Sequence, residues 1–554
     1  MKYKIVQMNP IVGDYRRNYE SLIDAYTVAN ADIVVFPELC LTGYPPNDLL
    51  FRPGFIEEQD RYIEKFRKET LDSDAVYILG AATRNNGPGK PFFNSALVIS
   101  RGKIILEYHK QLLPTYNIFD EARYFEPGDE NQNNIFECEN KRIAILICED
   151  CWNNEVVTNA PIYPTDPVSK AAPECDVLIT LNASPAHVGK DQERKKMYLS
   201  IAERYSIDII YANQVGGQDD LVFDGNSFGI INQKIYSALP YDEDKHFVVE
   251  EGRALNITKV DKYHQMLNHL SLGLYDYCRK NNFNKVVVGS SGGIDSALVI
   301  TLASLSLGKS NVYAITMPSK FSSEGSISHS EKLCKALGVK LFNRSIESEV
   351  ELSIRNFKEA FNENPSRLTI ENMQARIRGR ILMEYSNHFG AMLISTGNKS
   401  ESSVGYATIY GDMCGGLSLI ADLYKMEVYK LSRYINEYYG EEIIPNEIIN
   451  KAPSAELWEG QKDEDSLPPY PVLDSVLELY LEGDFINNER KEDLLHMIKG
   501  MTLEEMKRII KMVDGAEFKR KQSAPTIRVH NRAWGFGRNI PISKNVTPNL
   551  RSVI

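Results

Sequence analysis

The chain has 554 residues and a formal net charge of −12 at pH 7, which argues against a nucleic-acid-binding protein because such proteins carry basic patches. Its length exceeds what one hydrophobic core supports and predicts two domains of roughly 250 to 300 residues. No apolar run reaches membrane-spanning length and no apolar leader opens the chain, so we expect a cytoplasmic protein without a membrane partner.

Short apolar runs alternate with helix-like stretches in the first part of the chain. Such runs, interpreted as strands, occur at 32–36, 103–106 and 142–147, and a helix-like stretch occurs at 192–205. We therefore predict a layered α/β sandwich for residues 1–240 rather than an all-β fold.

Three reactive side chains follow three of these predicted strands: Glu38, Lys110 and Cys148. If the strands share one sheet edge, the three side chains meet at one rim. A thiolate is a nucleophile, a carboxylate accepts the thiol proton and returns it to a departing amine, and an ammonium stabilises a tetrahedral intermediate. The set predicts acyl transfer, although each residue alone also fits a structural role, as a core thiol or a strand-end charge.

The residues around these three positions resemble the signatures of the nitrilase superfamily, whose members cleave C–N bonds on an α-β-β-α sandwich. The matching strings are Phe36-Pro37-Glu38, Lys110-Gln111-Leu112-Leu113-Pro114 and Cys148-Glu149-Asp150-Cys151-Trp152. The resemblance implies that Glu38 is the base, Lys110 the charge stabiliser and Cys148 the nucleophile. In the glutamine-hydrolysing branch it implies substrate contacts from Tyr116, Glu149, Ser184 and Lys190.

The eight cysteines are scattered, which favours free thiols over a disulfide framework. Only Cys148 and Cys151 are close in sequence, and their spacing also fits a redox pair or half of a zinc site. No second cysteine pair accompanies them, and the nitrilase resemblance makes Cys151 incidental.

Residues 241–264 lose the strand pattern and are predicted to be a linker before a second domain, 265–554. That domain alternates strands and helices, which predicts a doubly wound parallel sheet, Rossmann-like, with ligands beyond the carboxyl ends of the strands. Two loops, 289–296 and 396–401, each follow a predicted strand and are expected to face one nucleotide.

The glycine-rich loop is predicted to cradle a phosphate, because backbone N–H groups at a helix start attract anions. Its sequence is Gly289-Ser290-Ser291-Gly292-Gly293-Ile294-Asp295-Ser296, which lacks the lysine of a Walker loop. The string Ser-Gly-Gly-x-Asp-Ser resembles the ATP-pyrophosphatase family, which adenylylates a substrate and releases pyrophosphate. The resemblance implies ATP contacts from this loop and Thr396, and Mg²⁺ held by Asp295 and Glu401.

Within that family, the strings at 371–376, 396–401, 410–412, 454–457 and 461–465 together resemble the NAD synthetases. The order of the two domains is similar to that of their glutamine-dependent members. This resemblance implies the substrates glutamine, ATP and deamido-NAD, a homo-oligomer, and deamido-NAD contacts from Asn372, Glu401 and Lys519. It also suggests that the acidic, proline-containing segment 451–471 is a lid.

The expected reaction therefore has two sites. Cys148 releases ammonia from glutamine, the ammonia reaches the other site by an internal passage, and it amidates an acyl-adenylate of deamido-NAD. Two alternatives stay open: amidation of another carboxylate or carbonyl, and a nitrogen-sensing protein built from two inactive domains. The presence of Glu38, Lys110, Cys148, Asp295 and Glu401 argues against a sensor, which needs none of this chemistry.

Overall fold

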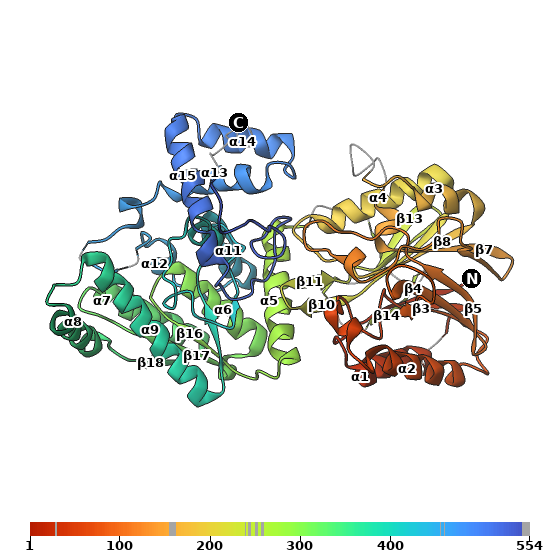
Figure 1. The fold of residues 1–554 in the computed structure, drawn as a ribbon, viewed down its shortest axis with the longest axis horizontal. Helices are drawn as coiled ribbons and strands as arrows, with labels where there is room; N and C mark the ends of the chain where they lie inside the picture. The colour runs from red at the N-terminus through yellow and green to blue at the C-terminus, as the bar shows by residue number, and fades with distance from the viewer. Residues whose placement is uncertain are drawn as a thin grey trace. The chain divides into compact units, whose positions relative to one another are not determined.

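The computed structural model describes residues 1–27, 30–153, 162–238, 240–241, 245–249, 253–255, 260–454, 456–458 and 460–545. The chain forms two compact units, Met1–Val260 and Asp261–Ile554, each described by itself (Figure 1). Among the residues in these ranges, none of the helices combines the length and the apolar character that crossing a membrane requires.

Six of the described strands form the first sheet of the N-terminal unit, in the order β14-β1-β2-β3-β4-β5. β1 to β3 run parallel, whereas β14 pairs antiparallel with β1, and β4 pairs antiparallel with both β3 and β5. The bounds are β1 (Tyr3–Gln7), β2 (Ile33–Val35), β3 (Val76–Arg84), β4 (Phe92–Ser100), β5 (Lys103–His109) and β14 (Lys245–Val248), with helices α1 (Tyr15–Thr27) and α2 (Phe55–Glu69).

Seven more described strands form the second sheet, in the order β15-β13-β12-β9-β8-β7-β6. The bounds are β6 (Ile135–Cys138), β7 (Lys141–Ile147), β8 (Val177–Asn182), β9 (Asp208–Asn213), β12 (Phe228–Ile231), β13 (Lys234–Ser237) and β15 (Arg253–Leu255), with helices α3 (Pro167–Ala171) and α4 (Lys190–Tyr205) and a hairpin of β10 (Val215–Gln218) and β11 (Leu221–Asp224). Figure 1 shows α1 and α2 outside the first sheet and α3 and α4 outside the second. The predicted α-β-β-α sandwich is confirmed.

Alternation along the strands explains this layering. Ile5 and Val35 belong to the apolar cluster that the two sheets share, whereas their neighbours Val6 and Val34 pack in the cluster that contains α1 and α2. Successive side chains on a strand point to opposite faces, so one apolar run contributes side chains to both apolar clusters.

The stretch 241–264, predicted as a linker, instead contributes the strands β14 and β15, which pair with β1 and β13. Both are short edge strands whose pairing is provided by distant parts of the chain, so no local pattern marks them. Residues 242–244, 250–252 and 256–259 of this stretch lie outside the described residues.

The C-terminal unit contains a parallel sheet of five described strands in the order β18-β17-β16-β19-β20. The strands are β16 (Val286–Gly289), β17 (Val312–Thr316), β18 (Lys340–Asn343), β19 (Met392–Ser395) and β20 (Leu417–Ser418). The chain winds outward from β16 in one direction and then returns to continue at β19, so the topological switch point lies between these two strands. The predicted doubly wound sheet is confirmed.

Helices surround this sheet, and Val287, Ile315 and Leu393 pack against α8 and α9. A further group of helices, α13 to α15, forms its own apolar cluster. The bounds are α5 (Lys262–Lys280), α6 (Ile294–Leu307), α7 (Glu324–Leu337), α8 (Glu347–Phe361), α9 (Arg367–Phe389), α10 (Lys399–Val404), α11 (Lys425–Tyr439), α12 (Asn446–Ile449), α13 (Tyr470–Glu482), α14 (Asn488–Met497), α15 (Leu503–Gly515) and α16 (Glu517–Arg520).

Gly80 on β3 lets the segment after β2 pass close to the first sheet. A Cβ atom at Gly80 would lie 2.4 Å from the backbone oxygen of Pro37 and 2.6 Å from Cα of Glu38. Neither backbone atom can move without shifting the segment that carries Glu38, so this position has no room for a side chain.

We expect Gly80→Ala to lower the free energy of unfolding of the N-terminal unit by about 2 kcal/mol or more, because the new methyl group overlaps backbone atoms. Gly87→Ala is the matched control, since its Cβ would meet only a side-chain oxygen of Asn85, at 3.2 Å. Urea unfolding of both variants measures the difference, and equal stabilities would contradict this account of the packing.

Candidate active sites

The ammonium of Lys110 lies between two buried glutamates in the N-terminal unit. Its Nζ is 2.8 Å from Oε1 of Glu38 and 2.8 Å from Oε2 of Glu121, and 0 % of the Lys110 side chain is exposed. Burial lowers the pKa of Lys110, but the charges of Glu121 and Glu38 outweigh this effect and raise it well above its ordinary value. The lysine therefore stays charged. Asn94 and the backbone N–H of Ala183 also donate to Glu38, at 2.7 and 2.8 Å, and fix its orientation.

Glu121 is a site residue that the sequence analysis missed. It lies in a 3₁₀ turn, Glu121–Arg123, and accepts a hydrogen bond of 2.8 Å from the hydroxyl of Tyr44. Burial is the main cause that raises the pKa of Glu121 to about 7. Because Glu121 follows no predicted strand, the strand-end pattern that marked Glu38 and Lys110 did not mark it.

Cys148 occupies a sharp turn at the end of β7, where it begins the 3₁₀ turn Cys148–Cys151. Its φ angle is 43°, in the left-handed region that side chains other than glycine seldom adopt. Asp150 fixes the turn: its carboxylate accepts backbone hydrogen bonds from Ile147, Gln111 and Leu112, at 3.0, 3.0 and 2.9 Å. The turn is thereby tied to the segment that follows Lys110.

The three predicted residues come from both sheets. Glu38 follows β2 and Lys110 follows β5 in the first sheet, whereas Cys148 follows β7 in the second, so the expectation of one shared sheet edge is wrong. The stacking of the two sheets brings them together. Burial raises the pKa of the Cys148 thiol well above its ordinary value, with Glu38 adding to this effect and Lys110 opposing it. The resting thiol is therefore protonated and needs a base.

Glu149, beside the cysteine, is held by two tyrosines. The hydroxyl of Tyr116 donates to its carboxylate at 2.9 Å, and that of Tyr163 donates at 2.9 Å. Burial raises the pKa of Glu149, which is 3 % exposed, while Lys110 and both hydroxyls oppose the rise. An anion with spare acceptor positions therefore stands beside the nucleophile.

Ser184 and Lys190 lie near the same site. Ser184 follows β8, is buried, and donates its backbone N–H to Asn213 at 2.9 Å. The ammonium of Lys190 lies 3.5 Å from the ring centre of Trp152, a cation–π contact, and burial lowers the pKa of this lysine. The structure thus brings Tyr116 and Lys190 close to Glu149, and Ser184 directly follows Ala183, whose backbone N–H donates to Glu38.

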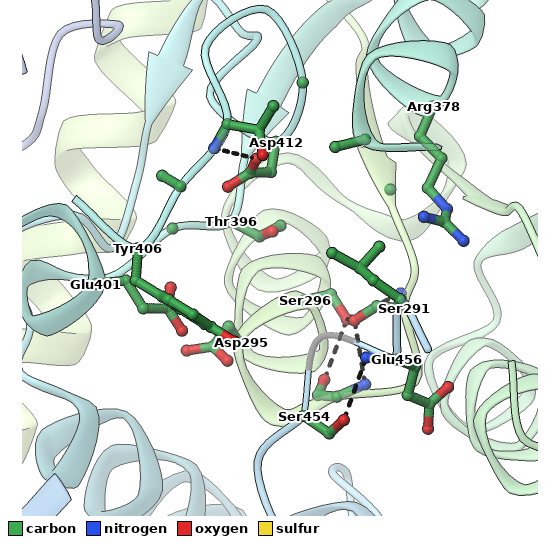
Figure 2. A pocket seen from close by; sticks show the side chains of 18 of the residues that line it. Ser291, Asp295, Ser296, Arg378, Thr396, Glu401, Tyr406, Asp412, Ser454 and Glu456 are labelled. Atoms are coloured by element: carbon green, nitrogen blue, oxygen red, sulfur yellow. Dashed lines mark hydrogen bonds between the residues drawn. The ribbon is translucent and has the colours of Figure 1, made fainter. Parts of the chain in front are cut away.

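A cavity of about 1110 Å³ lies in the C-terminal unit at the switch point between β16 and β19. It is lined by both predicted loops, which confirms that they face one space (Figure 2). The predicted residues that line it are Gly289, Ser290, Ser291, Gly293, Ile294, Asp295, Ser296, Asn372, Thr396, Glu401 and Lys519. Gly292 is not among them: with φ of 73°, it packs against α7, where a Cβ would meet the oxygen of Ser326 at 2.2 Å.

The glycine-rich loop is braced by its own serines. Ser291 accepts a hydrogen bond from the backbone N–H of Gly293 at 3.2 Å, and the hydroxyl of Ser296 donates to the oxygen of Gly293 at 3.0 Å. The hydroxyl of Ser290 instead donates to the hydroxyl of Ser330 at 2.8 Å and is therefore not directed at a ligand. The loop is therefore a formed turn at the start of α6, the geometry that favours a phosphate.

Lys425, at the start of α11, is a second residue that the sequence analysis missed. Its Nζ lies 2.5 Å from Oδ2 of Asp295 and 3.3 Å from Oε1 of Glu401. Burial raises the pKa of Glu401 to about 8, with Lys425 opposing this rise and Asp295 and Asp463 adding to it. One ammonium therefore faces three carboxylates.

This group of acidic side chains fits a Mg²⁺ ion, because carboxylate oxygens are ligands that Mg²⁺ takes in proteins. Within the described residues, no group of three acidic, histidine or cysteine side chains is arranged to hold a metal alone. Mg²⁺ commonly takes one or two carboxylates together with substrate phosphates, and Asp295 and Glu401 face the same cavity as the glycine-rich loop. Both residues are thus suitable ligands for Mg²⁺ that arrives with a nucleotide.

The other predicted contacts, Lys519 and Asn372, are held by the segment 405–408. Lys519 donates to the oxygens of Gly405 and Ala407 at 2.8 and 2.7 Å, and burial lowers its pKa. Asn372 accepts a hydrogen bond of 2.9 Å from Thr408. Both contacts lie along one wall of the cavity, formed by residues 405–412.

The segment predicted as a lid lies along the cavity in its described part. The carboxylate of Glu456 accepts hydrogen bonds from Ser323 and Ser326 at the start of α7, and Lys451 pairs with it at 2.8 Å. Arg378, on α9, directs its guanidinium into the same space (Figure 2). Residues 455 and 459 lie outside the described residues.

Comparisons with known proteins match both units. The carbon-nitrogen hydrolase family matches residues 5–233, and the NAD synthase family matches residues 266–523. The glutamine-dependent NAD(+) synthetase of Thermotoga maritima is 37 % identical over 98 % of both chains, and that of Synechocystis is 38 % identical over 98 % of this chain and 99 % of its own. A solved glutamine-dependent NAD(+) synthetase from Acinetobacter baumannii, in complex with adenosine diphosphate, is 33 % identical with a TM-score of 0.75 and covers 98 % of both chains.

An amidase-type unit with a buried cysteine, joined to a nucleotide-binding synthase unit, defines a ligase that forms a carbon–nitrogen bond. The two family matches follow each other along the chain, and the two named relatives match this chain over nearly their whole length. The chain belongs to the family of glutamine-dependent NAD(+) synthetases.

We expect Lys110→Met to destabilise the N-terminal unit by about 3–5 kcal/mol, because two buried carboxylates lose their counter-charge. Lys4→Met is the matched control: Lys4 is also buried, but its Nζ donates to the backbone oxygen of Ala25, at 2.9 Å, and pairs with no carboxylate of the described residues. Its replacement should cost less than about 1 kcal/mol. Urea unfolding compares the two variants, and similar losses would contradict the described charge pairing.

Proposed function

We propose that the N-terminal unit hydrolyses glutamine through Glu38, Lys110 and Cys148. Glu38 takes the proton from the Cys148 thiol, and Sγ attacks the amide carbon of the glutamine side chain. Lys110 stabilises the oxyanion, and Glu38 returns the proton to the departing ammonia. Water then cleaves the glutamyl thioester to glutamate and frees the thiol.

The observation that supports this most strongly is the buried pair of Lys110 and Glu38, whose Nζ and Oε1 lie 2.8 Å apart, with Asn94 and the backbone N–H of Ala183 also donating to Glu38. The Cys148 thiol is buried in the same site, and burial raises its pKa. Such a thiol is inert until a base removes its proton, and Glu38 is fixed by three donors for that task. For substrate binding, we propose that Glu149 receives the α-ammonium of glutamine and that Lys190 and Ser184 receive its carboxylate.

We propose that the C-terminal unit adenylylates deamido-NAD. The nicotinate carboxylate attacks the α-phosphorus of ATP, and pyrophosphate leaves into the nest formed by residues 289–296. Ammonia then attacks the acyl-adenylate, giving the amide of NAD and AMP. Bound Mg²⁺, held by Asp295 and Glu401, would neutralise phosphate charge, and Lys425 contributes a fixed positive charge beside them.

We expect Cys148→Ala to lower glutamine-dependent NAD formation by roughly 10⁴-fold or more, since the nucleophile is lost. Formation of NAD from added ammonium should persist. Cys151→Ser is the control, because Cys151 is 0 % exposed in the apolar cluster and has no part in the proposed chemistry. Equal losses of glutamine hydrolysis in both variants would overturn the assignment of the nucleophile.

We expect purified protein given glutamine and ATP to amidate deamido-NAD, and not aspartate or a xanthosine nucleotide. AMP and pyrophosphate should form in a one-to-one ratio with NAD, as the adenylylation step requires. Chromatography of the nucleotides measures this ratio. ADP and phosphate as products would exclude adenylylation, and amidation of another acceptor would replace the proposed substrate.

A further inference from the structure

Two tyrosines, rather than one, hold the carboxylate beside the nucleophile. Tyr116 belongs to the segment after Lys110 and donates to both oxygens of Glu149, at 2.9 and 3.2 Å. Tyr163 approaches from another part of the chain and donates to Oε1 at 2.9 Å. Neither the sequence signatures nor the reaction requires Tyr163, so its hydroxyl needs an explanation of its own.

The position of Tyr163 is set by a buried asparagine. Asn153 is 8 % exposed, and its Nδ2 donates to the backbone oxygens of Tyr163 and Thr165 at 3.0 and 2.7 Å. Its Oδ1 accepts the backbone N–H groups of Ile162 and Tyr163 at 2.9 and 3.2 Å. Asn153 follows Trp152, the aromatic platform of Lys190, so one short stretch after Cys148 arranges the whole substrate end of the site.

Hydrogen bonds from neutral donors give a buried carboxylate a fixed orientation without neutralising its charge. Three of the acceptor positions of Glu149 are used by the two hydroxyls, and the remaining positions are open to a cationic donor. Lys110 and Lys190 both lower the pKa of Glu149 through their charge, but neither is hydrogen-bonded to it in any described contact. Lys110 pairs with Glu38 and Glu121, and Lys190 lies over Trp152. The anion is thus prepared for a cation that arrives with the substrate.

We propose that Tyr163 is a positioning residue for substrate specificity: it fixes Glu149 so that this carboxylate selects amides that carry an α-ammonium group. The inference rests on the proposed hydrolysis of glutamine and extends it to a residue outside the reacting set. Tyr163 acts through Glu149 and does not touch the amide that is cleaved. Its loss therefore changes discrimination between substrates more than it changes the chemical step.

The test compares Tyr163→Phe with wild type on glutamine and on glutaramate, the analogue in which hydrogen replaces the α-amino group. Removing one hydrogen bond to a charged group should lower kcat/KM for glutamine about tenfold. The loss should appear in KM, with kcat little changed, and glutaramate hydrolysis should change less than about twofold. Tyr205→Phe is the matched control, because the Tyr205 hydroxyl, at the end of α4, has no hydrogen-bond partner among the described residues.

Equal relative losses of kcat/KM on both substrates leave the ratio of the two values unchanged. That result would show a merely structural effect and overturn the inference. Thermal unfolding of Tyr163→Phe, compared with Tyr205→Phe, shows whether the fold is retained. Failure of the wild-type protein to release ammonia from glutamine would overturn the proposed function and this inference together. Normal wild-type hydrolysis with an unchanged substrate ratio would overturn the inference alone.

Discussion

The N-terminal site depends on one buried ammonium held between two carboxylates. Lys110, at 0 % exposure, is paired with Glu38 and Glu121, so removing any one of the three leaves a buried charge without its partner. This mutual requirement fixes the ends of β2 and β5 relative to each other. It also keeps the proposed base, Glu38, and the proposed charge stabiliser, Lys110, at hydrogen-bond distance before any substrate is bound, which is the preorganisation that acyl transfer needs.

The C-terminal unit also places one lysine among acidic side chains, but the number of acidic side chains differs. Lys425 also lies among carboxylates, but three of them, Asp295, Glu401 and Asp463, influence one another there. In the N-terminal site two acidic side chains share one lysine, whereas here three acidic side chains lie around one lysine. The first arrangement suits proton transfer within the protein, and the second suits a ligand that carries its own divalent cation with phosphates.

The sequence allowed prediction of those site residues that stand at the end of a regular apolar run or in a turn between a strand and a helix. Glu38, Lys110 and Cys148 each follow an apolar run, and Gly289 to Ser296 joins a strand to a helix, so the pattern marked them as candidates and the family resemblances gave them their expected roles. Glu121 was missed because it follows no such run. Lys425 was missed because its pairing with Asp295, 130 residues earlier in the chain, leaves no trace in the local pattern. The strands β14 and β15, and the contribution of both sheets to the first site, likewise depend on long-range packing that local pattern does not carry.

The proposed reaction passes through an acyl-adenylate of deamido-NAD, which ammonia then converts to the amide. The most direct measurement uses deamido-NAD labelled with ¹⁸O in its nicotinate carboxylate, with glutamine, ATP and the purified protein. If the carboxylate attacks the α-phosphorus, mass spectrometry will find one ¹⁸O atom in each AMP formed and none in pyrophosphate. Unlabelled AMP, or label in inorganic phosphate, would contradict the account.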